Sequence, residues 1–126
     1  MTLLDRERLK LNLLRATIAL CLRHEKIAEL TRQARAVPGC ETAAADSIIP
    51  HFDYCTDRMS SPGYDCESQP IRWWEMSETQ LATLCGPCRS RVTIWEERAK
   101  LKRGIGGATR ALLMAYRAYM AAEAQA

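Results

Sequence analysis

Two cysteines separated by two residues form the strongest chemical motif in this sequence, Cys85-Gly-Pro-Cys88. This spacing lets both sulfur atoms turn toward one point, where a pair of thiolates supplies half of a tetrahedral zinc site. Pro87 suits the first turn of a helix, because its missing amide hydrogen costs little there. Cys88 would then lie in that first turn, where the helix dipole favours a thiolate. The motif therefore predicts two ligands of a structural zinc ion.

The other two ligands are expected upstream, in a segment rich in turn-forming residues. Cys55 and Cys66 stand eleven positions apart, and residues 60–63 (Ser-Ser-Pro-Gly) can reverse the chain between them. Cys21, by contrast, suits a small buried apolar residue. The predicted zinc ligands are Cys55, Cys66, Cys85 and Cys88. The reserve ligands, either of which could replace Cys55 or Cys66, are His51 and Cys40.

A thiol-redox role for Cys85 and Cys88 is an alternative interpretation of the same motif. Cys-Gly-Pro-Cys followed by Arg89 resembles the active-site tetrapeptide of thioredoxins, in which the pKa of the first cysteine is lowered. That tetrapeptide belongs between a strand and a helix of a βαβ fold. Here the residues before Cys85 have a helical pattern, and no parallel-sheet pattern is present. The zinc interpretation is therefore favoured.

Leu84-Cys-Gly-Pro-Cys-Arg-Ser-Arg resembles the second knuckle of treble-clef zinc modules, including the zinc-bearing half of HNH-type nucleases. The resemblance covers about residues 51–95 and implies the zinc ligands alone. The only histidines are His24 and His51, and none follows Cys88, so the catalytic residues of those nucleases have no counterpart. No catalytic residue is predicted. In its compactness and its Arg and Ala content, the chain also looks like the small zinc-binding accessory proteins of tailed phages and prophages.

A long amphipathic helix is expected over residues 3–36, with Thr2 as its N-cap and Asp5 three positions on. Apolar residues lie on two neighbouring faces at three- and four-residue spacing. One face holds Leu4, Leu11, Leu14, Ile18 and Cys21. The other holds Leu13, Leu20, Ile27 and Leu30. So wide a stripe should be buried against two partners, which allows a homodimer.

The pattern along the whole chain predicts a single, mainly α domain over 1–126. Its parts are an N-terminal helix (1–37), a cysteine-containing acidic loop region (38–76) and C-terminal helices (77–126). Short extended pieces are expected near 48–54 and 70–75. Ser77 and Gln80 form a capping box, and further helices should cover 87–103 and 107–123, separated by glycines. The predicted fold is three long helices in a bundle-like arrangement, with the zinc-pinned loop between the first and second.

Charge alternates along the chain. Residues 1–36 carry a balance of +4, residues 37–79 carry −6 and residues 80–126 carry +5, within a net charge of +3. No secretory signal or membrane-spanning apolar run is visible, so a reducing bacterial cytoplasm is expected. In that compartment paired cysteines favour metal binding over disulfides.

Two further groups could contact a partner. Trp73 and Trp74 lie beside the cysteine region, and alternation allows one to be buried while the other anchors a partner. A basic run could contact nucleic acid or an acidic protein, with Arg91, Arg98 and Lys102 near one helical face. Its members are Arg89, Arg91, Arg98, Lys100, Lys102, Arg103 and Arg110. A solvated helix face, partly paired with Glu96 and Glu97, is the alternative for this run.

These features favour a non-enzymatic, zinc-stabilised binding protein of phage origin. It would dock on a host or phage nucleoprotein complex and inhibit or regulate it, as anti-defence proteins do. A regulator or recombination accessory that binds nucleic acid directly is a second hypothesis, and an enzyme, either a thiol-redox protein or a degenerate nuclease, is a third.

Overall fold

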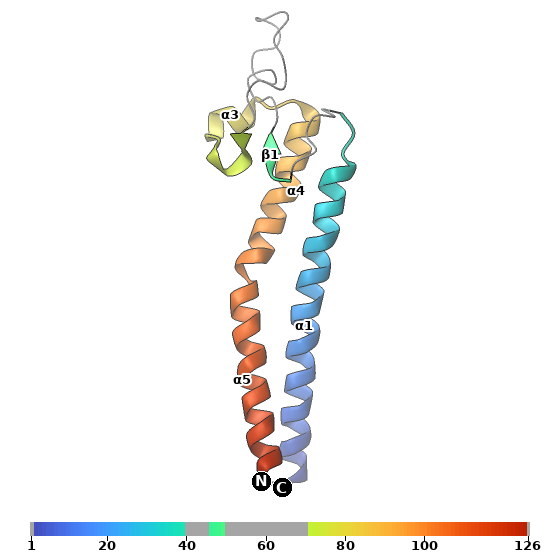
Figure 1. Cartoon of the computed structure of the whole chain (residues 1–126), viewed down its shortest axis with the longest axis vertical. Helices are drawn as coiled ribbons and strands as arrows, with labels where there is room; N and C mark the ends of the chain where they lie inside the picture. The colour runs from blue at the N-terminus through green and yellow to red at the C-terminus, as the bar shows by residue number, and fades with distance from the viewer. Residues whose placement is uncertain (1, 40–45, 50–70, 126) are drawn as a thin grey trace, which may run out of the picture. The chain divides into compact units, whose positions relative to one another are not determined.

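The computed structural model describes residues 2–39, 46–49 and 71–125 (Figure 1). This part of the chain is mostly helical, which confirms the mainly α class. Its three long helices are α1 (Leu3–Ala36), α4 (Gly86–Arg103) and α5 (Ile105–Ala124). The shorter elements are β1 (Ile48–Ile49), β2 (Ile71–Arg72), the 3-10 helix η1 (Trp73–Glu75) and α3 (Glu78–Ala82). The loop predicted to be pinned by zinc falls largely outside the described residues.

Capping residues at the start of α1 and helix-breaking residues after it determine where this helix begins and ends. At the start, the backbone N–H of Asp5 donates to Thr2 Oγ1 over 3.1 Å, and the Thr2 N–H donates back to Asp5 Oδ2 over 3.3 Å. This reciprocal cap satisfies backbone donors that the first turn leaves unpaired. The hydrogen bond from the Thr2 hydroxyl also lowers the pKa of the Asp5 carboxyl. At the other end Pro38 and Gly39, with a φ of +92°, stop the helix.

From Ser77 onward, each helix begins within a few residues of the position that the sequence predicts. Ser77 and Gln80 form both hydrogen bonds of the predicted capping box at the start of α3. The helix expected from residue 87 begins one residue earlier, at Gly86. The break between α4 and α5 is shorter than predicted, since only Gly104 lies outside the helices while Gly106 and Gly107 belong to α5. The carbonyl of Gly104 accepts from the N–H of Ala108, which continues the helical pattern across this break.

The chain divides into two compact units. Unit 1 comprises Met1–Ala28 and Arg98–Ala126, and unit 2 comprises Glu29–Glu97. The main buried cluster lies in unit 2, where side chains from α1, β1 and α4 meet those around α3. Its members are Ala34, Ile49, Met76, Leu84, Cys88, Val92 and Trp95.

The two short strands of unit 2 form an antiparallel pair, with Ile48 opposite Arg72 and Ile49 opposite Ile71. A further backbone bond runs from the Trp73 N–H to the Ser47 carbonyl over 3.0 Å. The pairing carries Ile49 into the buried cluster and holds η1 beside it. The predicted extended pieces at 48–54 and 70–75 are therefore confirmed only at Ile48–Ile49 and Ile71–Arg72 among the described residues.

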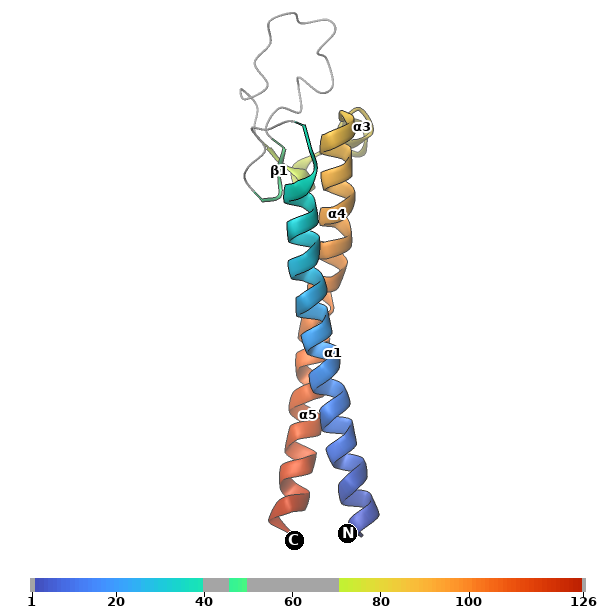
Figure 2. The same ribbon diagram turned by 90° about the vertical axis from the view of Figure 1, so that its right-hand side faces the viewer.

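In unit 1, α5 runs antiparallel to the N-terminal part of α1, as two views at right angles show (Figures 1 and 2). The partly covered residues of α1 recur at three- and four-residue intervals, the spacing of a coiled-coil seam: Leu9, Leu13, Ala16 and Leu20. The corresponding residues of α5 are Leu112, Ala115, Tyr119 and Ala122.

Two contacts mark the register of this helix pair. Arg6 Nη2 lies 2.7 Å from Glu123 Oε1, and this hydrogen bond lowers the pKa of the Glu123 carboxyl and raises the pKa of Arg6. Toward the other end, a Cβ built on Gly104 would lie 2.6 Å from Arg23 Nη1. The guanidinium of Arg23 therefore fills the space that the missing side chain of Gly104 leaves.

The two glycines inside α5 give a first testable prediction. A Cβ on Gly106 or Gly107 would meet no atom within 4 Å. Replacing either by Ala should raise the free energy of unfolding by about 0.5–1 kcal/mol, because Ala reduces the entropy of the unfolded chain. Urea denaturation followed by circular dichroism measures the change. Gly39→Ala is the matched control and should destabilise, since its φ is positive and its Cβ would lie 2.7 Å from Pro87 Cγ. Unchanged stability in both α5 variants would contradict the placement of Gly106 and Gly107 in a helix with open space around them.

Candidate functional site

Cys85 and Cys88 lie on one turn at the start of α4. Cys88 is fully buried against the main cluster of unit 2, and Cys85 is half-buried directly before the helix. The turn is held by Arg89, whose backbone N–H donates to the Cys85 carbonyl over 2.9 Å. Its guanidinium Nη2 also donates to the carbonyls of Ala82 and Leu84. The two cysteines predicted as zinc ligands thus lie on one turn held by hydrogen bonds.

The other predicted ligands, Cys55, Cys66, His51 and Cys40, lie outside the described residues. Within 2–39, 46–49 and 71–125, no three His, Cys, Asp or Glu side chains come close enough together to hold a metal ion. Cys21 is exposed on α1 in unit 1, where the sequence suggested a buried apolar residue. The four-sulfur zinc site stays a prediction, and Cys85 and Cys88 are the two of its ligands whose surroundings are known.

The setting of the Cys85-Gly-Pro-Cys88 motif differs from that of a thioredoxin. The motif follows the short helix α3 and a turn, where the thioredoxin arrangement has a strand. The two strands among the described residues are antiparallel and come from β1 and β2.

The basic run divides into structural and exposed members. Arg91 and Arg98 are each only 4% exposed, so the predicted exposed face of Arg91, Arg98 and Lys102 is not present. Arg91 closes the end of α1 instead, because its Nη2 donates to the carbonyls of Val37 and Gly39, each over 2.8 Å. Its Nε donates to a third carbonyl, that of Ala34, over 3.4 Å. These bonds satisfy acceptors that a helix C-terminus leaves unpaired.

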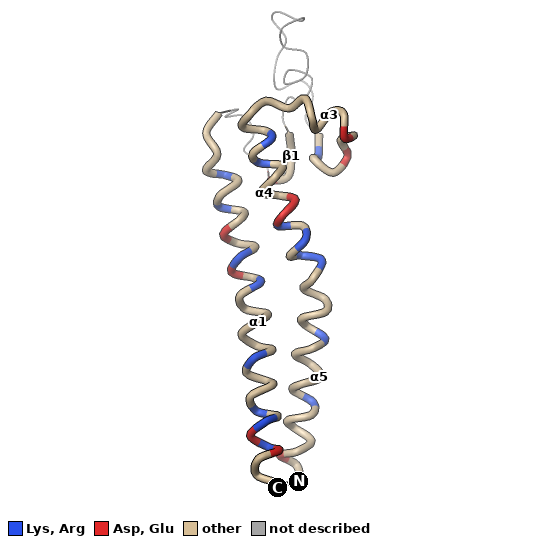
Figure 3. The backbone as a smooth tube through the Cα atoms, turned by 180° about the vertical axis from the view of Figure 1, so that it is seen from behind, with Lys and Arg blue, Asp and Glu red and all other residues tan. Residues whose placement is uncertain are grey.

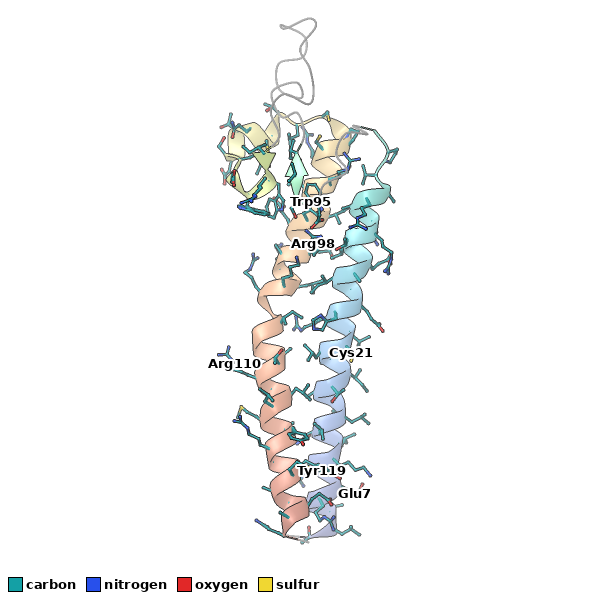
Figure 4. The ribbon with its side chains drawn as sticks, viewed as in Figure 1. Glu7, Cys21, Trp95, Arg98, Arg110 and Tyr119 are labelled. Carbon is teal, nitrogen blue, oxygen red and sulfur yellow. The ribbon has the colours of Figure 1, made fainter. Side chains whose placement is uncertain are left out.

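Arg89 is exposed at the start of α4, where it donates to the carbonyls of Ala82 and Leu84. The four other members of the run are exposed at the end of α4 and on α5. They are Lys100, Lys102, Arg103 and Arg110. Figure 3 shows Lys and Arg along both helices of unit 1, and in Figure 4 the side chain of Arg110 points away from α1. Unit 1 as a whole carries twelve Lys and Arg against four Asp and Glu, a formal balance of +8. Its surface is therefore strongly positive.

The tryptophan pair splits as alternation predicts. Trp73 packs against the main cluster of unit 2, whereas Trp74 is 57% exposed. Their rings meet edge to face, with centroids 6.0 Å apart and an interplanar angle of 83°. The Arg72 guanidinium lies 5.8 Å from the centroid of Trp74. Trp74 and Arg72 thus form an exposed contact surface, and Trp73 holds it to the core.

Unit 1 exposes many large apolar side chains. On α1 these are Leu3, Leu4, Leu11, Leu14, Ile18 and Leu22, and on α5 they are Leu113, Met114, Tyr116 and Met120. The wide stripe predicted for α1 is thus real, and only the side facing α5 is covered within unit 1. A hollow of about 340 Å³ between the two helices is lined by Lys10, Leu13, Leu14, Thr17 and Tyr119. No local sequence signal predicts this hollow, because it depends on the register of α5 against α1.

No helix in the described ranges is both long enough and apolar enough to cross a membrane. Comparison with protein-family models, with curated proteins and with solved structures found no match to this chain.

Proposed function

We propose that this chain is a non-enzymatic, zinc-stabilised binding protein that docks on a protein component of a nucleoprotein complex and inhibits or regulates it. The observation that carries the proposal is the exposed apolar surface of unit 1, which lies on a strongly basic pair of helices. Scattered apolar side chains are normal on protein surfaces, but an exposed row at helical spacing, such as Leu113, Tyr116 and Met120 on α5, is typical of a binding site.

The zinc site is proposed to have a structural role in this protein. Unit 2 has a small buried cluster, and a domain of this kind gains stability from a metal that joins distant segments. Cys88 would bind the ion from inside the cluster while Cys85 binds from its edge. Bound zinc would supply a crosslink between the start of α4 and the segment that holds Cys55 and Cys66, and no catalytic step is assigned to it.

A phage origin and an anti-defence role belong to the same proposal. They rest on the resemblance to small accessory proteins of tailed phages and on the combination of a basic, apolar docking surface with a zinc knuckle. A partner that already binds nucleic acid carries acidic or nucleic-acid surfaces nearby, which would speed association with a unit of +8.

A pull-down of the tagged full chain from bacterial host lysate tests the proposal, with and without nuclease treatment. We expect one protein complex to be retained at constant stoichiometry in both arms, and to be lost when Leu14 and Tyr116 are both replaced by Glu. A double variant with Lys100 and Lys102 replaced by Gln should retain the complex. Loss of every protein partner after nuclease treatment would contradict the proposal.

Direct nucleic-acid binding is the second candidate, because Lys100, Lys102, Arg103 and Arg110 are exposed on unit 1. The nuclease arm of the same experiment separates the two. If nucleic acid alone is captured, and the Lys100 and Lys102 variant releases it, this second function replaces the first. Binding through phosphate contacts should then weaken steeply as salt rises.

A further inference from the structure

We infer that the groove between α1 and α5 in unit 1 binds a single acidic amphipathic helix of a partner protein. This inference rests on the proposed function and names the surface and the partner chemistry for it. We call the surface the inter-helix groove and define its floor as the hollow lined by Lys10, Leu13, Leu14, Thr17 and Tyr119.

The floor of the groove is an open hollow lined mainly by apolar side chains, and it can accept an apolar side chain of a partner. Its volume is about 340 Å³, and Leu13 and Leu14 of α1 face Tyr119 of α5 across it. In Figure 4 the Tyr119 side chain points toward α1. Lys10 stands at the same hollow and supplies a positive charge beside the apolar wall. One apolar side chain and one carboxylate of a docked helix would match this combination.

The α5 rim of the groove is a row of exposed apolar residues at helical spacing. Leu113, Tyr116 and Met120 follow one another at intervals of three and four residues and are 46%, 49% and 45% exposed. The next residue at this spacing is Glu123, which pairs with Arg6 of α1. That pair shows that this flank of α5 borders α1, so the row lies along the groove. A third helix laid there would cover Tyr116 and the exposed part of Leu14 together.

Helix packing explains why a helix is the matching occupant. Two antiparallel helices with a three- and four-residue seam leave a groove parallel to their axes, into which a third helix can place its own a and d residues. Next to the seam, Leu14 of α1 and the row Leu113, Tyr116 and Met120 of α5 are exposed. The row on α5 has the same three- and four-residue spacing as the seam. An extended peptide would instead need an unpaired sheet edge, and unit 1 contains none among its described residues.

The charge of unit 1 decides between the possible helical partners. At a balance of +8, a second copy of unit 1 would bring like charges together, including Lys10 at the groove. A helix with Glu or Asp flanking its apolar row would meet this positive surface with opposite charge.

Fluorescence anisotropy with a synthetic probe tests the inference on the full-length zinc-loaded chain. The probe is a labelled helical peptide of about three heptads with Leu at a and d and Glu at e and g. We expect 1:1 binding with a dissociation constant in the micromolar range. A peptide with Lys at e and g, and a Glu peptide of the same composition with its heptads scrambled, should both fail to bind.

Matched variants locate the binding surface. Tyr116→Glu should weaken binding of the acidic probe at least tenfold. Met114→Glu adds the same charge to the same helix at a residue that is 70% exposed, yet lies about 200° around the helix from Tyr116, so it should change binding less than twofold. Circular dichroism confirms that both variants keep their helices. Equal effects of the two variants would overturn the inference, because simple charge attraction would then explain binding.

Three other results would also overturn it. The acidic probe could fail to bind, the chain could dimerise in sedimentation through a surface that Tyr116→Glu breaks, or vesicles of anionic phospholipid could bind with the same dependence on Tyr116. The proposed function fails separately. If the pull-down retains a protein complex that Tyr116→Glu leaves intact, the function stands and the groove is not its site.

Discussion

A Cys88→Ser variant is expected to lose its bound zinc and the cooperative unfolding of unit 2. A serine hydroxyl is a poor zinc ligand at neutral pH, and the loss of one thiolate from a four-sulfur site removes most of its affinity. Zinc binding by small structural sites contributes on the order of 10 kcal/mol, which exceeds the usual stability of a domain this size. Native mass spectrometry of the purified protein reports the metal, and thermal denaturation reports the transition.

Two further variants make this result decisive. Cys21→Ser, at the exposed cysteine of unit 1, should keep both the zinc and the transition. Cys88→Ala separates a ligand from a merely buried side chain. If Cys88 only fills space in the cluster, Cys88→Ala should cost about 1 kcal/mol and leave the metal content unchanged. A full complement of zinc in Cys88→Ser would refute the ligand assignment.

The second large effect is expected from Arg91→Met. Arg91 donates to the carbonyls of Ala34, Val37 and Gly39 from a buried position, so the substitution keeps the volume and removes every donor. Hydrogen bonds from a charged group, made to carbonyls that have little access to water, are worth more than ordinary ones. We expect a loss of about 3 kcal/mol in the free energy of unfolding, measured by urea denaturation of the purified full-length protein.

Lys100→Met is the matched control for Arg91→Met, because it removes an exposed charge from the same helix and should change stability by less than about 0.5 kcal/mol. Arg91→Lys should recover only part of the loss, since an ammonium group cannot reproduce the fork of a guanidinium. Equal stability of Arg91→Met and Lys100→Met would show that the three carbonyls find other donors.

Local signals in the sequence predicted helix starts well. Thr2 with Asp5 and Ser77 with Gln80 each specify a cap through side chains only three residues apart, and both caps form as predicted. Pro38 and Gly39 predicted the end of α1 for an equally local reason. The glycines after Arg103 misled the prediction, because only Gly104 lies outside the helices. Gly106 and Gly107 sit inside a helix that neighbouring residues stabilise.

The site residues were harder to predict because they depend on contacts between distant parts of the chain. A helical wheel placed Arg91 and Arg98 beside Lys102, but it could not show that the first two are buried. The carbonyls that Arg91 contacts lie more than fifty residues earlier in the sequence. The inter-helix groove likewise exists only once α5 is set against α1 in one register. Trp73 and Trp74 divide between core and surface as predicted, although both lie in the 3-10 helix η1 and not in an alternating strand.

The two register marks of unit 1, Arg6 with Glu123 and Arg23 over Gly104, limit how this protein can change in length during evolution. An insertion or deletion in α1 alone would move one mark relative to the other and leave an arginine opposite the wrong neighbour. The antiparallel pair formed by α1 and α5 can lengthen or shorten only by whole heptads, added to or removed from both helices together. Relatives of this chain should therefore differ in unit 1 by paired steps of about seven residues.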